Sequence, residues 1–180
     1  MVNFITAVLL ILFAAFSRLI PHPMNFAPIA AIALFAAVYL DKKYSIIIPL
    51  AALVISDAIL GFYAGIEWVY GSFVLIALVG FWLKKRVSGA GTGKKTAFVA
   101  GTTIFSSVLF FVFTNFGVWL SGMYYDMSFS GLAQCYTMAI PFFRNTLAGD
   151  LVFTGAMFVI YETVIRFAKN SEVQTSRVRK

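Results

Sequence analysis

The sequence predicts an all-α integral membrane protein, a bundle of six transmembrane helices with its N- and C-termini cytoplasmic. Hydrophobic residues make up 61% of the 180-residue chain and charged residues only 12%, whereas soluble domains are roughly 45–50% apolar and about 25% charged. The apolar residues gather in runs, and the basic residues fall between those runs. This composition excludes a soluble enzyme, a disordered tail protein and a disulfide-stapled secreted module.

A membrane span needs about 17–25 apolar residues. The chain contains six apolar segments of about this length, at residues 4–20, 28–40, 45–62, 66–83, 96–120 and in a long run within 131–167. The second segment is too short to span alone, so we expect it to be tilted, buried or extended at its ends.

Two segments need separate justification. No Lys or Arg precedes the first apolar run, and Arg18 follows it, whereas a secretory signal carries its positive charge in front. We therefore expect a retained first helix. In the last run, Pro141 breaks a helical hydrogen bond, which predicts a short outer helix over 132–140 and a span over 142–166.

The basic residues predict the orientation through the positive-inside rule. With six spans and cytoplasmic termini, twelve of the 14 Lys and Arg residues share the inner side, namely Lys42, Lys43, Lys84, Lys85, Arg86, Lys94, Lys95, Arg166, Lys169, Arg177, Arg179 and Lys180. Only Arg18 and Arg144 fall outside. Topology thus explains the net charge of +7 without a nucleic-acid partner. We expect one transmembrane domain over 1–168 and a polar, disordered cytoplasmic tail over 169–180.

Polar side chains concentrate in the predicted outer half, where charges within hydrocarbon face the bundle interior and find partners. They are Arg18, His22, Asn25, Asp57, Glu67, Asn115, Asp126, Arg144, Asn145 and Asp150. Arg18 and Arg144 balance Asp57 and Asp150, which predicts a paired network around a cavity open to the outside. Three roles stay open for these charges: an interhelical ion-pair lock, ligand contact, or ion coupling.

Helical spacing places some of these residues on common faces. Thr146, Asp150 and Thr154 recur every four residues and form one polar stripe. Asn115 and Trp119 also share a face, which fits the lining of a small-molecule site as well as an interhelical hydrogen bond beside an interfacial anchor.

Residues 21–28 hold three prolines in eight positions, which predicts a stiff, extended connection. Irregular backbone at membrane depth is tolerated where it is buried in protein or lines a wet cavity. We interpret the segment as lining the outer pocket with Asn25, whereas His22 fits that role or a solvent-facing connector. The following alanines form small-xxx-small pairs, Ala27/Ala31 and Ala33/Ala37, for close packing within the bundle or against a partner.

Four stretches resemble a bacterial family of six-span membrane proteins defined as a domain of unknown function: residues 18–28 (RLIPHPMNFAP), 55–61 (ISDAILG), 114–122 (TNFGVWLSG) and 141–150 (PFFRNTLAGD). The turn at 18–21 and the SDxxxG end of the third segment are also distantly similar to the S components of energy-coupling-factor transporters. That likeness implies solute binding near the outer face of a bacterial cytoplasmic (inner) membrane and energising by a partner module.

The leading functional hypothesis is a substrate-binding membrane transport component that captures a small solute on the extracytoplasmic side. Its candidate ligand-binding residues are Arg18, His22, Asn25, Asp57, Asn115, Trp119, Arg144, Asn145 and Asp150. Residues 89–95 lack the phosphate-loop spacing, so ATP hydrolysis would need separate subunits.

The alternatives are a stand-alone proton-coupled carrier that uses Asp57 or Asp150, and a non-catalytic structural membrane protein. Acid–base chemistry by His22 with an aspartate is possible in principle, but the sequence has no nucleophile motif. One Cys and one His exclude an internal disulfide and a multi-histidine or cysteine-cluster metal site. We therefore expect no enzyme activity, no cofactor and no resident metal.

Overall fold

The computed structural model describes residues 2–178, with side chains described for residues 4–167. This part of the chain is all-helical, and its element order is α1 (Val2–Leu19), α2 (Ile29–Tyr39), α3 (Lys42–Leu60), α4 (Ile66–Val87), α5 (Thr92–Leu120) and α6 (Phe129–Val178). Four stretches are long and apolar enough to cross a membrane, namely α3, α4, α5 and residues Phe129–Phe167 of α6. Phe4–Leu19 and Ile29–Tyr39 are shorter apolar helices. The chain is thus a multi-pass helical membrane protein.

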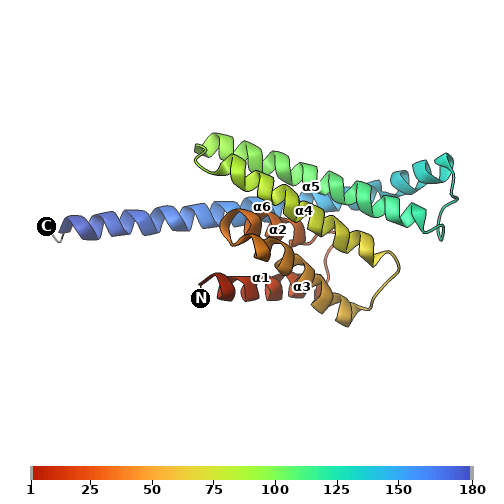
Figure 1. The fold of residues 1–180 in the computed structure, drawn as a ribbon, viewed down its shortest axis with the longest axis horizontal. Coiled ribbons are helices and arrows are strands. Elements are labelled where there is room, and N and C mark those ends of the chain that lie inside the picture. Colours follow the sequence, from red (N-terminus) through yellow and green to blue (C-terminus); the bar gives the residue numbers. More distant parts are fainter. Residues whose placement is uncertain (1, 179–180) are drawn as a thin grey trace.

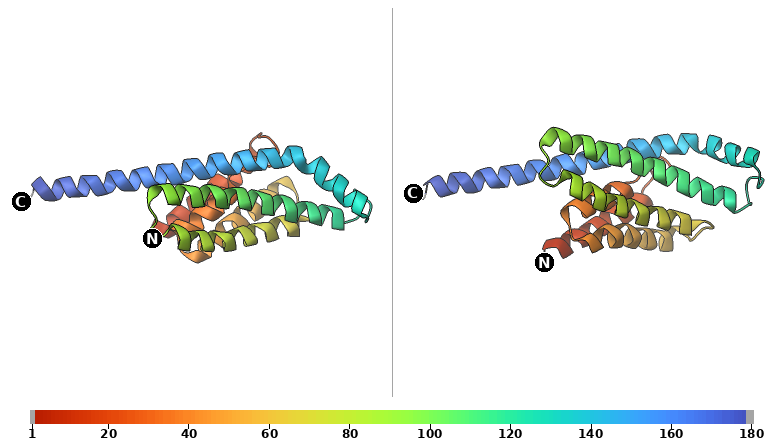
Figure 2. Two further views of the ribbon diagram at one scale, coloured as in Figure 1. Left: turned by 90° about the horizontal axis from the view of Figure 1, so that it is seen from above. Right: turned by 45° about the horizontal axis from the view of Figure 1, so that its top comes forward.

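Successive helices run in opposite directions along the long axis of the molecule (Figure 1). The connections at 20–28, 61–65 and 121–128 lie toward one end, which we call the proline-loop end. The connections at 40–41 and 88–91 lie toward the other end, together with the N-terminus and the C-terminal part of α6 (Figures 1 and 2).

α2 lies at the centre of the bundle, so of the alternatives expected for this short segment (tilted, buried, or extended at its ends) the structure shows a buried helix. Residues 29–38 are all buried, and α2 packs against α3, α4 and α6. A helix that is apolar all round is expected to be enclosed by protein. The alanine pairs act within the bundle: a Cβ added at Gly80 of α4 would lie 2.5 Å from the Ala37 Cβ, so the two helices approach closely.

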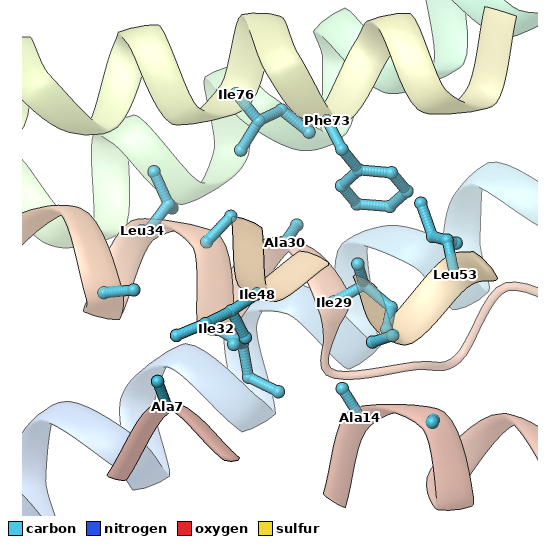
Figure 3. Close-up of a cluster of buried hydrophobic side chains, with 14 of the residues drawn as sticks. Ala7, Ala14, Ile29, Ala30, Ile32, Leu34, Ile48, Leu53, Phe73 and Ile76 are labelled. Carbon is cyan, nitrogen blue, oxygen red and sulfur yellow. The ribbon is translucent and has the colours of Figure 1, made fainter. Parts of the chain in front are cut away.

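Side chains of α1, α3 and α4 pack together around those of α2 (Figure 3). Because lipid tails are as apolar as leucine, the close packing of these groups, rather than their removal from water, stabilises the bundle. The labelled residues of this cluster are Ala7, Ala14, Ile29, Ala30, Ile32, Leu34, Ile48, Leu53, Phe73 and Ile76.

α6 differs from its sequence prediction at both ends. Pro141 lies inside one continuous helix, so the expected division into 132–140 and 142–166 is wrong. A proline removes only its own N–H from the ladder, and such a position is tolerated in membrane helices; Figure 2 shows the first turns of α6 at an angle to the rest. The backbone also stays helical to Val178, whereas we expected a disordered tail from residue 169. A helix already formed extends at little cost, one hydrogen bond per added residue.

Candidate functional site

A cavity of about 240 Å³ opens among the helices at the proline-loop end, and we call it the proline-loop cavity. Drug-sized ligand pockets span about 300–1,000 Å³, so this volume fits a small solute. Its polar lining comes from α1, the 20–28 connection, the loop after α3, and α6: Arg18, His22, Asn25, Tyr63, Thr146 and Asp150. Its apolar lining comes from α2, α3, α4, α5 and the residue before the N-cap of α2: Ala27, Ile29, Ala30, Leu53, Leu60, Val69, Phe73 and Phe110.

The 20–28 connection is folded over this cavity by a tight turn. The Phe26 N–H donates to the Pro23 carbonyl at 3.0 Å, and Asn25 has a φ of 63°, the one positive value among the described residues other than glycine. Asparagine tolerates this left-handed conformation better than most residues. His22 Nδ1 lies 2.7 Å from the Pro23 carbonyl oxygen and donates to it. Both His22 and Asn25 therefore line the cavity, as predicted for Asn25.

α6 anchors this connection through a glycine. A Cβ added at Gly149 would lie 3.2 Å from the Phe26 Cα, so the two backbones approach closely. The Phe26 ring also packs against Phe153, with ring centroids 5.4 Å apart. The proline connection is thus held against the same helix that carries Asp150.

Arg18 and Asp57 form an ion pair across the bundle. Arg18 Nη2 lies 2.7 Å from Asp57 Oδ1, a contact of opposite charges without the alignment of a hydrogen bond. Arg18 Nη1 donates to Ser56 Oγ, and the Tyr70 hydroxyl donates to Asp57 Oδ2 at 3.0 Å. Asp57 is fully buried. This group of side chains, which we call the Arg18–Asp57 network, joins α1, α3 and α4.

Asp150 lines the cavity from α6 and has a different environment. It is 3% exposed, and its Oδ2 accepts from Ser107 Oγ on α5 at 2.7 Å. No Lys, Arg or His among residues 4–167 forms an ion pair with it. Thr146 and Thr154, one turn to either side, are also buried, so the predicted polar stripe of α6 faces the bundle interior.

The structure does not bring the remaining predicted residues into the cavity. The Asn115 side-chain amide donates to the Phe111 carbonyl of its own helix at 2.8 Å, and Trp119 Nε1 donates to the Asp126 carbonyl at 3.0 Å. Arg144 is exposed and makes no ion pair with any described residue. Asn145 is half-buried outside the cavity lining. The predicted four-charge network is thus a single pair, with Arg144 and Asp150 on different sides of α6.

The sequence did not lead us to a row of buried hydroxyl side chains on α5, which we call the polar seam, or to the groove next to it. Thr102, Thr103, Ser106 and Ser107 are all buried, and the four-residue spacing of Thr103 and Ser107 matches that of Asp150 and Thr154 on α6. This spacing was the available signal. Toward the other end lies a groove of about 370 Å³ between α5 and α6, which we call the α5–α6 groove; its lining includes Thr103 and Thr154.

An ion pair lies at the far end of the α5–α6 groove. Lys95 pairs with Glu162, which also accepts from the Tyr39 hydroxyl at 2.5 Å. Arg166 Nη2 donates to Thr92 Oγ1 at 3.1 Å. Within the described part of the chain, no three His, Cys, Asp or Glu side chains come together as a metal site would require.

Comparison with known proteins places the chain in one family. No curated protein and no solved structure matches the chain. A family model described as "Family of unknown function (DUF6580)" matches residues 1–173. The chain therefore belongs to the DUF6580 family.

Proposed function

We propose that this protein crosses a bacterial cytoplasmic membrane six times, with both termini inside, and captures a small solute from the extracytoplasmic side. Two features support the topology. Successive helices alternate in direction (Figure 1), and the helix ends that carry basic residues, namely the start of α3, the end of α4 and the start of α5, lie at the end opposite the proline loop. The positive-inside rule places that basic end in the cytoplasm.

The proline-loop cavity carries the proposal of solute binding. Apolar and aromatic walls with a few placed polar groups are the usual composition of a small-molecule site. Here Asn25, Thr146 and Asp150 bring an amide, a hydroxyl and a carboxylate to a wall that includes Phe73 and Phe110. In this proposal the protein is a non-catalytic transport component, similar in role to an S component, and separate ATPase subunits supply the energy.

Cysteine labelling tests the topology. In a Cys135→Ser background, we expect a membrane-impermeant maleimide to label Tyr124→Cys on intact cells and Ser88→Cys only after permeabilisation. Both positions are exposed and lie in connections at opposite ends of the bundle. Labelling of both on intact cells would contradict the crossing of the membrane by α5, and the reverse order would contradict the proposed orientation.

Native mass spectrometry tests the binding. We expect the protein, released gently from its own membrane, to carry a small-molecule adduct that is lost in Asn25→Gly and Thr146→Val. Glycine at position 25 keeps the positive φ accessible, and valine preserves the shape of threonine. Arg144→Ala is the matched control, because Arg144 lies on the same helix as Thr146 but outside the cavity. A bare wild-type protein in good yield, or an adduct unaffected by both cavity variants, would contradict solute capture.

The carrier is the second candidate, and one observation favours it. Thr103 and Thr154 line the α5–α6 groove and lie one helical turn from Ser107 and Asp150. Asp150 lines the proline-loop cavity, and Ser107 donates to it. Polar side chains of α5 and α6 thus run between the proline-loop cavity and the α5–α6 groove. A carrier would take up the solute identified by mass spectrometry into liposomes that lack ATPase subunits, with a rate that responds to a pH gradient. Indifference to the gradient would leave the S-component-like role.

A further inference from the structure

Of the two charged side chains that line the proline-loop cavity, Arg18 has an oppositely charged partner and Asp150 has none among the described residues. Arg18 is neutralised by Asp57 at 2.7 Å, and the second oxygen of Asp57 is taken by the Tyr70 hydroxyl. Among the side chains of residues 4–167, Asp150 accepts a hydrogen bond from the Ser107 hydroxyl alone, at its Oδ2, and that hydroxyl also contacts the Thr103 carbonyl at 3.1 Å. The cavity thus presents one carboxylate that has no cationic partner among the described residues.

The elements packed against α6 offer Asp150 no cation. α5 and α2 are its neighbours. The basic residues of α5, Lys94 and Lys95, lie at least 12 residues before Ser107, about 18 Å along the helix, and the titratable group of α2 is Tyr39 at its last residue. The remaining titratable groups of the cavity lining are the paired Arg18, His22 and the Tyr63 hydroxyl.

We propose that the solute is a small cation, a protonated amine whose ammonium group pairs with Asp150. This inference rests on the proposed function and specifies its substrate class. An unpaired charge at membrane depth is costly, and an ammonium ion in the cavity offsets that cost, whereas an anion adds to it.

The aromatic walls fit the same class of solute. Phe73 and Phe110 line the cavity with ring centroids 5.4 Å apart, and Tyr63 lines it too. The faces of aromatic rings attract cations, and the attraction strengthens when the cation is desolvated. Recognition of charge at Asp150 and of the apolar part of the amine at these rings would then combine in one site.

Three two-carbon probes that each carry a hydroxyl group test the charge preference: ethanolammonium, ethylene glycol and glycolate. The unfolding temperature of the purified protein is measured against the concentration of each, because a ligand that binds only the folded state stabilises it. We expect ethanolammonium to stabilise wild type more than the neutral and anionic probes. Asp150→Asn should lower the apparent affinity for ethanolammonium about tenfold to a hundredfold, the effect of losing a charge-assisted bond.

Asp126→Asn is the matched control, because Asp126 is an exposed aspartate outside the cavity, and its response should equal that of wild type. An equal response of wild type and Asp150→Asn to ethanolammonium, including none in either, would overturn the proposal. A wild-type preference for glycolate or ethylene glycol would overturn it without any variant. A neutral or acidic adduct in native mass spectrometry would overturn the cation assignment while leaving solute capture intact.

Discussion

Asp57 and Asp150 are two aspartates of one cavity region, buried to almost the same degree, with opposite electrostatic situations. Asp57 is 0% exposed, pairs with Arg18 and accepts a hydrogen bond from Tyr70. Asp150 is 3% exposed and, among residues with described side chains, accepts a hydrogen bond from Ser107 alone. The first carboxylate belongs to α3 and joins three helices. The second belongs to α6 and lines the cavity. Burial alone therefore does not separate a structural charge from one available to a ligand; the presence of a cationic partner does.

The largest expected effect is the loss of the partner in the Arg18–Asp57 network. Arg18→Met leaves Asp57 buried without its cation, and breaking a buried pair in this way costs about 3–5 kcal/mol. We expect a strongly lowered unfolding temperature in detergent, recovered in part by Arg18→Met combined with Asp57→Asn. An unchanged unfolding temperature in the single variant would show that the pair does not stabilise the bundle.

Removing one hydrogen bond from Asp57 or from Asp150 should have a smaller effect on stability, and it should show which of the two carboxylates takes part in solute binding. Tyr70→Phe and Ser107→Ala each remove one hydrogen bond to an aspartate, worth about 0.6 kcal/mol on average between membrane helices. Stability should fall by similar small amounts in both. Only Ser107→Ala should change the fraction of protein that carries a solute adduct in native mass spectra. The same adduct change in Tyr70→Phe would place Asp57 in the binding site as well.

The smallest effect is expected at Arg144. Its side chain is exposed and forms no ion pair with the described residues, so Arg144→Ala should shift stability by less than about 0.5 kcal/mol. Thermal unfolding beside Arg18→Met checks this. A loss comparable to that of Arg18→Met would show a partner for Arg144 and restore the four-charge network.

Much of this arrangement was predictable from the sequence because it depends on local rules. The apolar runs predicted six helices close to their observed bounds, and the four-residue repeat of Thr146, Asp150 and Thr154 predicted a common buried face. The prolines of 21–28 predicted the connection that lines the cavity with Asn25. Each of these features follows from spacing or from backbone chemistry within one segment.

The rest depends on how each helix is rotated in the bundle, which spacing within one helix does not specify. Asn115 and Trp119 share a face of α5, but that face lies away from the cavity. Arg144 lies two residues from Thr146 and therefore points to another side of α6. A single sequence also could not predict which aspartate pairs with Arg18. Arg18 and Asp57 lie on different helices, α1 and α3, so their pairing depends on how those helices pack.

The central claim is that Arg18 neutralises the carboxylate of Asp57, whereas the carboxylate of Asp150 lines the cavity and has no cationic partner among the described residues. The most direct test compares two isosteric amide variants, Asp57→Asn and Asp150→Asn. Thermal unfolding is measured on washed protein in detergent, without added solute. Asp57→Asn leaves Arg18 unpaired and should lower the unfolding temperature. Asp150→Asn removes a carboxylate that has no cationic partner in the described part of the chain, and it should leave the unfolding temperature unchanged or raise it. A similar fall in both variants would contradict the account, because it would mean that Asp150 also has a stabilising partner.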